Sequence, residues 1–100
     1  MKMSSRGVVF ALVSRRATVE FGANSRKGVS RQSIVELANQ IAKVDAATVQ
    51  KALEWLSTEG YITLNTKTII IRNAGWELAD RYVRALKKWY NKSKPNPNAA

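Results

Sequence analysis

The 100-residue sequence contains no cysteine and no histidine. The first absence excludes disulfides and thiolate chemistry, and the second removes the commonest metal ligand and the commonest general base. The sequence also lacks a phosphate-cradling glycine loop, a signal-peptide pattern and any apolar run near the roughly 20 residues that span a bilayer. We therefore expect a cytoplasmic protein that is not an enzyme and has no cofactor, metal or membrane partner.

Acidic residues are scarce as well. Seventeen Lys and Arg residues stand against seven Asp and Glu residues, which gives a formal charge of +10. A field of that sign attracts polyanions. The charge is uneven, because residues 1–33 carry +6, 61–72 carry +2 and 73–100 carry +4, whereas 34–60 carry −2. We expect nucleic acid as the partner, held by basic flanks around a central segment; the alternative is a charge that serves only solubility or heat adaptation.

The central segment begins with two helix signals separated by a turn at residues 42–44. Ser30 and Ser33 compete as the N-cap of the first helix, and we prefer Ser30. Asp45 is a good N-cap for the second helix, which Gly60 ends. Apolar residues at three- and four-residue steps predict a buried stripe on each helix: Ile34, Leu37, Ala38 and Ile41 on the first, and Val49, Ala52, Leu53 and Leu56 on the second.

Two runs rich in β-branched and aromatic residues follow the helices. They span residues 61–64 and 68–71, and the polar turn 65–67 between them predicts a β-hairpin. Residues 29–30 are expected to add a brief strand to this hairpin. The predicted fold class is therefore mainly α with a small β-hairpin, α+β.

The segments outside the two helices and the hairpin differ from one another in the structure that they are expected to form. Ser4 or Ser5 is expected to cap a first helix through about Phe21, although the β-branched density of residues 8–13 also fits a strand. The loop at residues 22–28 is basic and bracketed by glycines, and it either reaches a phosphate or is a solvated connector. The final residues, 92–100, are expected to form a disordered basic tail.

The last helix is expected to follow Asn73 as its cap and to run over about 74–91. It carries an apolar seam whose residues recur at alternating three- and four-residue steps. A domain this small cannot cover so long a seam with its own core, so we expect a two-fold homodimer. The alternative is that the aromatic residues fold back on the first helix of the same chain. The residues assigned to dimerisation are Trp76, Ala79, Val83, Leu86, Trp89 and Tyr90.

Three segments together resemble the winged helix-turn-helix superfamily of DNA-binding proteins: IVELANQIA at 34–42, ATVQKALEWL at 47–56 and EGYI at 59–62. The segment GWELA at 75–79 is similar to the glycine-led start of the last helix in MarR-like and PadR-like repressors. The short basic chain also resembles small DNA-binding proteins of archaea and of their viruses and plasmids. The resemblance implies a winged helix over residues 1–91 with an additional long C-terminal helix for dimerisation.

The resemblance also implies that the helix from Asp45 to Glu59 lies in the major groove of DNA and that Lys67, at the hairpin tip, touches a phosphate or the minor groove. The amide, hydroxyl, ammonium and methyl groups of this helix suit base edges and phosphates, although an ordinary solvated helix face is the alternative. Glu54 on the same face is expected to discourage phosphate approach. The expected DNA-binding residues are Ser30, Arg31, Gln32, Ala46, Ala47, Thr48, Gln50, Lys51, Lys67, Arg26 and Lys27.

Three functions fit this reading of the sequence. The first is a dimeric, nucleoid-associated transcription regulator that represses by occluding double-stranded DNA. The second is an architectural or segregation protein that coats DNA with little sequence preference, which the small number of base-reading side chains favours. The third is an interaction module whose winged helix binds another protein, which is consistent with the net negative charge of residues 34–60.

The seam of the last helix generates the first prediction. Leu86→Asp places a carboxylate in the apolar seam, and we expect it to convert a dimer into a monomer because an unpaired charge in an apolar interface is costly. Sedimentation analysis of the variant and of the unmutated chain measures this. A monomeric unmutated chain would remove the dimer altogether.

Overall fold

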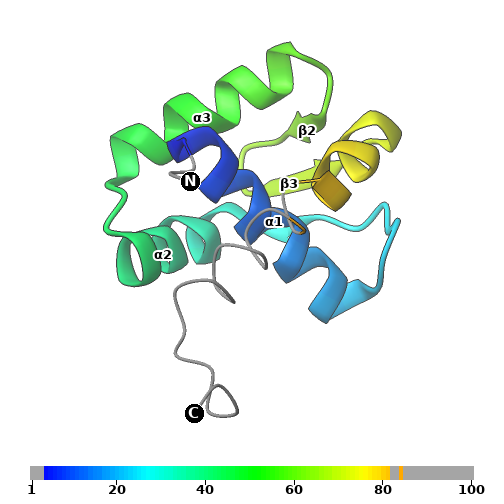
Figure 1. Ribbon diagram of the computed structural model, residues 1–100, viewed down its shortest axis with the longest axis horizontal. Coiled ribbons are helices and arrows are strands. Elements are labelled where there is room, and N and C mark those ends of the chain that lie inside the picture. The colour runs from blue at the N-terminus through cyan, green and yellow to red at the C-terminus, as the bar shows by residue number, and fades with distance from the viewer. Residues whose placement is uncertain (1–3, 82–83, 85–100) are drawn as a thin grey trace, which may run out of the picture.

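The computed structural model describes residues 4–81 and residue 84 (Figure 1). The chain forms, in order, α1 (Ser5–Phe21), β1 (Val29–Ser30), α2 (Arg31–Ala42), α3 (Ala46–Thr58), β2 (Ile62–Leu64), β3 (Thr68–Ile71) and a last helix that begins at residue 73. This mainly helical fold with a small sheet confirms the predicted α+β class. The expected remainder of the last helix and the expected tail at 92–100 lie outside the described residues.

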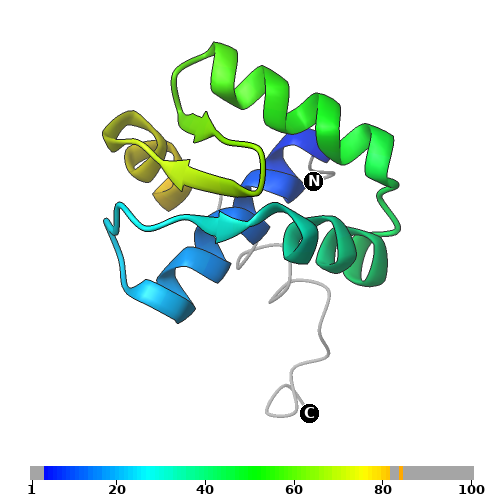
Figure 2. The same cartoon turned by 180° about the vertical axis from the view of Figure 1, so that it is seen from behind.

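The three strands form one antiparallel sheet in the order β1-β3-β2. Val29 pairs with Ile69, and Ile69 also pairs with Leu64 on the other side, so β3 is the central strand (Figure 2). The brief strand predicted at residues 29–30 is therefore confirmed. It joins the hairpin even though it contributes only two residues.

The first segment is a helix and not the alternative strand. The side chain of Ser4 accepts a hydrogen bond from the backbone N–H of Gly7 at 3.1 Å, which caps the N-terminus of α1. Val9, Val13 and Ala17 recur four residues apart and are all buried. Helical spacing places these residues on one face, and α1 contacts α2, α3 and β1 from the middle of the molecule (Figures 1 and 2).

Polar side chains cap the N-termini of α2 and α3, and Lys43 ends α2 at the turn that joins the two helices. The Ser30 hydroxyl accepts from the Ser33 N–H at 3.3 Å, which confirms the preferred cap, and Asp45 Oδ1 accepts from the Thr48 N–H at 2.7 Å. Lys43 ends α2 in the left-handed region with φ 57°, and its N–H donates to the carbonyl of Asn39 at 3.1 Å. A lysine therefore occupies the position at which glycine is usual.

Two sequence predictions about helix ends are wrong. Ile41 is 66% exposed, because α2 ends one residue later and the following Val44 packs against the core instead. Asn73 does not cap the last helix but is its first residue, since the Trp76 N–H donates to the Arg72 carbonyl at 2.9 Å. The Asn73 side chain accepts a hydrogen bond from Arg26 at 2.6 Å.

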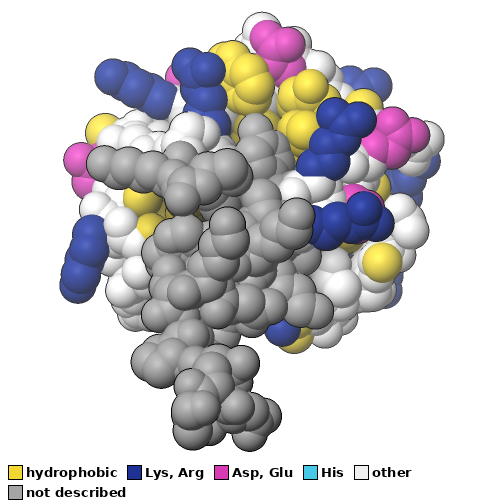
Figure 3. Space-filling view, in the orientation of Figure 1, with side chains coloured by type: hydrophobic (Ala, Val, Ile, Leu, Met, Phe, Trp, Pro, Cys, Tyr) yellow, Lys and Arg dark blue, Asp and Glu magenta, His cyan; other side chains and the backbone are white. Residues whose placement is uncertain are grey.

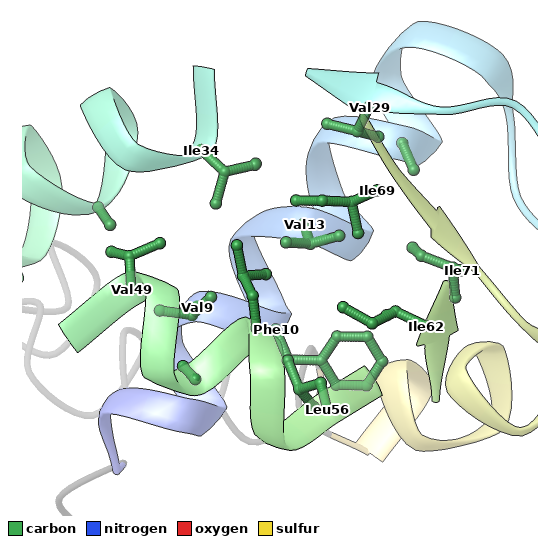
Figure 4. Close-up of a cluster of buried hydrophobic side chains, with 14 of the residues drawn as sticks. Val9, Phe10, Val13, Val29, Ile34, Val49, Leu56, Ile62, Ile69 and Ile71 are labelled. Carbon is green, nitrogen blue, oxygen red and sulfur yellow. The ribbon is translucent and has the colours of Figure 1, made fainter. Parts of the chain in front are cut away.

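A single hydrophobic core joins the helices to the sheet. Side chains from α1 point toward α3 on one side and toward the sheet on the other (Figure 4). The labelled side chains in this cluster are Val9, Phe10, Val13, Val29, Ile34, Val49, Leu56, Ile62, Ile69 and Ile71. Because every element contributes to the same cluster, the relative positions of α2, α3 and the hairpin are fixed by shared packing.

Gly75 marks the closest approach between the last helix and the segment before β2. A Cβ atom built on Gly75 would lie 2.0 Å from the backbone oxygen of Tyr61 and 2.8 Å from Cγ2 of Ile71. Gly-to-Ala substitution ordinarily stabilises a helix by up to about 1 kcal/mol. Here the obstructing atom belongs to the backbone, so we expect Gly75→Ala to lower the free energy of unfolding by about 1–3 kcal/mol or more.

Urea denaturation measures this change. Glu77→Ala, at an exposed position of the same helix, is the control and is expected to stay within about 0.5 kcal/mol of the unmutated protein. A Gly75→Ala variant as stable as the unmutated protein would contradict the close approach.

Candidate nucleic-acid interface

One surface groove lies between the N-terminus of α2, the exposed side of α3 and the turn between β2 and β3. Its lining contains two cations, two amide side chains and no carboxylate. The lining residues are Ser30, Arg31, Gln32, Val35, Gln50, Thr66 and Lys67. Five of the predicted DNA-binding residues thus meet in one groove although they come from three separate segments of the chain.

The short strand β1 brings these segments together. Ser30 pairs with Thr68 at the start of β3, and the N–H of Arg31 donates to the carbonyl of Lys67 at 3.0 Å. Because β1 ends at Ser30, α2 begins directly beside the hairpin turn. The N-terminal end of α2 carries the partial positive charge of the helix dipole, which adds to the charges of Arg31 and Lys67.

Arg31 connects all three walls of the groove. Its Nη1 donates to the carbonyl of Asn65 at 2.8 Å and, more weakly, to that of Thr66 at 3.4 Å, and its Nη2 donates to Oε1 of Gln50. Gln50 in turn donates from Nε2 to Oε1 of Glu54 at 3.1 Å. A continuous polar chain therefore runs from the hairpin turn through Arg31 and Gln50 to Glu54.

The exposed side of α3 lies opposite the buried stripe that the sequence predicts. Ala47, Lys51, Glu54 and Thr58 are exposed, whereas the predicted stripe of Val49, Ala52, Leu53 and Leu56 is buried. Ala46 is also exposed, and Thr48 is half-buried with its N–H held by Asp45. The first turn of α3 consequently offers mainly methyl groups to the solvent, and the hydrogen-bonding and charged side chains begin with Gln50 and Lys51.

Arg26 and Lys27 lie apart from this groove. Their loop is attached to the last helix, because Trp76 Nε1 donates to the carbonyl of Ser25 at 3.1 Å and Arg26 bonds Asn73. Lys27 stands over the ring of Phe21, with Nζ 5.8 Å from the ring centroid. The loop lies at the opposite side of the molecule from α2 (Figure 2). The structure therefore does not bring these two predicted residues together with the others.

The first residues of the predicted dimer seam contact their own chain. Ala79 is 3% exposed and belongs to the core, so its assignment to a dimer surface is corrected. Trp76 is half-buried, packs against the same core and bonds Ser25. This part of the last helix therefore packs against the core of its own domain. Val83, Leu86, Trp89 and Tyr90 lie outside the described residues.

Two features were not predicted from the sequence, namely the backbone contacts that hold Arg31 and the side-chain partner of Gln50. Asn65 and Thr66 contribute backbone carbonyls, which no side-chain pattern signals. Glu54 acts as the partner of Gln50, and the four-residue spacing of the two side chains on one helix was the available signal.

Lys and Arg side chains also lie at several places around the face seen in Figure 3, where acidic side chains are fewer.

Comparison of the chain with protein-family models, curated proteins and solved structures finds no match. Among the described residues, no group of His, Cys, Asp and Glu side chains could hold a metal ion. Over the same part of the chain, no helix has the length and hydropathy to cross a membrane. The groove and the positive charge of the chain are therefore the two features that bear on its function.

The cap of α3 generates a prediction of pH dependence. Hydrogen bonds from Thr48 lower the pKa of Asp45 below 3.8, and the charge of Lys51 contributes less. Since the folded-state pKa is the lower one, the ionised cap stabilises the fold above pH 3.8, and this contribution is lost as the pH falls through the folded-state pKa. Asp45→Asn keeps an oxygen acceptor but cannot titrate.

We therefore expect the unmutated protein to lose more stability than Asp45→Asn when the pH is lowered from about 5 to about 2. Urea denaturation at several pH values measures the difference. Parallel stability curves for the two proteins would show that the Asp45 carboxylate is not held in its ionised form by the fold.

Proposed function

We propose that this protein is a winged helix-turn-helix protein that binds double-stranded DNA. In this proposal α3 enters the major groove, and the turn between β2 and β3 is the wing. The observation that supports it most is the convergence of the α2 N-terminus, α3 and the wing on one groove whose lining has no carboxylate. A pair of helices joined by a short capped turn and followed by a hairpin supports the same assignment.

The charges around the groove suit a phosphate backbone. Lys67 lines the groove at the wing, and Lys51 lies on the exposed side of α3 next to Gln50, so the two ammonium groups come from different elements. Phosphate contacts of this kind fix the position of a protein on DNA, whereas contacts to base edges specify the sequence. Lys51 and Lys67 are therefore assigned to phosphates, and Gln50 is assigned to a base edge.

A regulator that represses by occlusion requires a defined binding site. A homodimer reading two half-sites about one helical turn apart supplies one. The dimer contact in this proposal is the later part of the last helix, with Val83, Leu86, Trp89 and Tyr90, because Ala79 is already committed to the core of its own chain. A nucleoid-associated location in the cytoplasm follows from the same proposal.

A second candidate is an architectural or segregation protein that coats DNA with little sequence preference. The observation that favours it is the first turn of α3, in which the exposed side chains of Ala46 and Ala47 carry only methyl groups. Such a protein binds through phosphates, so its affinity depends steeply on salt and little on sequence. A regulator binds its site far more tightly than random duplex.

Fluorescence anisotropy with a duplex selected from a random pool and with random duplex tests the proposal. Lys51→Ala is expected to weaken binding to both duplexes and to reduce the salt slope by about one. Gln50→Ala is expected to weaken binding to the selected duplex by about 5- to 150-fold and to change binding to random duplex much less.

Arg81→Ala is the matched control for Lys51→Ala and Gln40→Ala is the control for Gln50→Ala, because Arg81 and Gln40 are exposed and lie outside the groove. Arg81→Ala is expected to weaken binding to both duplexes less than Lys51→Ala does, and Gln40→Ala is expected to change the preference for the selected duplex less than Gln50→Ala does. Equal affinity for the two duplexes with a steep salt slope would favour coating. No binding to any duplex at low salt would reject DNA binding and leave the protein-interaction module.

A further inference from the structure

The amide of Gln50 is held from both sides. Its oxygen accepts from the Arg31 guanidinium, and its nitrogen donates to the Glu54 carboxylate at 3.1 Å. The reversed amide would place an NH2 group against the cation and an oxygen against the anion. Both contacts would then be repulsive, so the two charged neighbours fix which end of the amide points in which direction.

The Arg31 side chain is itself fixed by the wing. Nη1 donates to the carbonyls of Asn65 and Thr66, and Nη2 donates to Gln50, so both terminal nitrogens of the guanidinium are engaged by the protein's own acceptors. Hydrogen bonds from a charged donor are shorter and stronger than neutral ones. An arginine engaged in this way is less available to a phosphate than Lys67 or Lys51.

Glu54 is the feature that a simple phosphate-binding surface does not explain. A carboxylate on the exposed side of α3 repels the DNA backbone, and it reduces the positive charge of the surface. Its hydrogen bond to Nε2 of Gln50 gives it a different use, which is to hold the amide nitrogen.

The bonds to Arg31 and Glu54 leave part of the Gln50 amide unused. An amide oxygen has two lone pairs and an amide nitrogen has two hydrogens, and each contact occupies one of them. One acceptor position and one donor remain. A glutamine reads adenine with one acceptor and one donor, by accepting from N6 and donating to N7 in the major groove.

From these contacts we infer that Arg31 and Glu54 are positioning residues that orient Gln50 to read an adenine. This inference rests on the proposed function and deepens it, because it names the base read and assigns Arg31 a role other than phosphate binding. The wing takes part through its carbonyls of Asn65 and Thr66, since they hold Arg31 in place.

The DNA test uses Arg31→Lys and Glu54→Ala with a selected duplex and with duplexes in which each adenine is replaced in turn. Arg31→Lys keeps the positive charge but loses the planar guanidinium group, whose nitrogens bond both the wing and Gln50. We expect it to reduce the adenine preference at one position about tenfold while leaving the salt slope and the affinity for random duplex nearly unchanged. A phosphate-binding arginine would instead lose affinity equally for all duplexes.

Glu54→Ala is expected to lose the same adenine preference and to bind random duplex more tightly, because a repulsive charge is removed. Glu77→Ala is its control, because Glu77 is an exposed carboxylate on the last helix that does not line the groove. The control is expected to keep the adenine preference.

A measurement on the free protein separates the failure of this inference from the failure of DNA binding. In nuclear magnetic resonance spectra, the Gln50 side-chain amide protons are expected to differ from those of exposed Gln40, and Arg31→Lys and Glu54→Ala are expected to abolish the difference. The measurement needs no DNA. If Arg31→Lys does not fold, the comparison of Glu54→Ala with the unmutated protein provides the test.

The possible results test the inference about Gln50 and the proposed DNA binding separately. If the unmutated protein binds duplex but Arg31→Lys and Glu54→Ala keep the adenine preference, the inference is overturned and the proposed function stands. If no duplex is bound, the proposed function and the adenine contact both fall. In that case the amide spectra alone establish or reject the Arg31–Gln50–Glu54 chain.

Discussion

The pairing of β1 with β3 is the constraint on which the groove depends. Only Val29 and Ser30 form β1, and their pairing with Ile69 and Thr68 places the start of α2 against the hairpin turn. Buried Val29 and Ile69 anchor this pairing in the core that also holds α1 and α3. A longer strand or a longer connection would move Arg31 away from the carbonyls of residues 65 and 66, and the groove would lose its link between the turn at 65–67 and α3.

The same arrangement gathers positive charge at one place. Arg31 and Lys67 lie beside the N-terminal end of α2, where the helix dipole already favours negative charge. Carbonyl oxygens from the turn between β2 and β3 accept hydrogen bonds from the Arg31 guanidinium and offset the unfavourable position of a cation at a helix N-terminus. The remaining excess of positive charge favours a polyanion, and binding one would stabilise the folded state through mass action.

Local chemistry made much of the fold predictable from sequence. Ser30 and Asp45 cap their helices as expected because each supplies a side-chain oxygen to an N–H three residues later. Ile41 and Ala79 were misjudged because their exposure depends on where α2 ends and on how the last helix meets the core, which spacing alone does not fix. The gathering of Ser30, Arg31, Gln32, Gln50 and Lys67 could be anticipated, whereas the position of Arg26 depends on tertiary contacts with Asn73.

The central proposal is that the groove between α2, α3 and the turn at residues 65–67 is the surface that meets DNA. Titration of the labelled protein with duplex DNA, followed by backbone amide resonances, tests it most directly. The account predicts that the resonances of residues 30–33, 46–51 and 65–67 shift most, and that those of the loop at 22–28 shift little. Shifts concentrated in that loop, or no shifts at low salt, would contradict it.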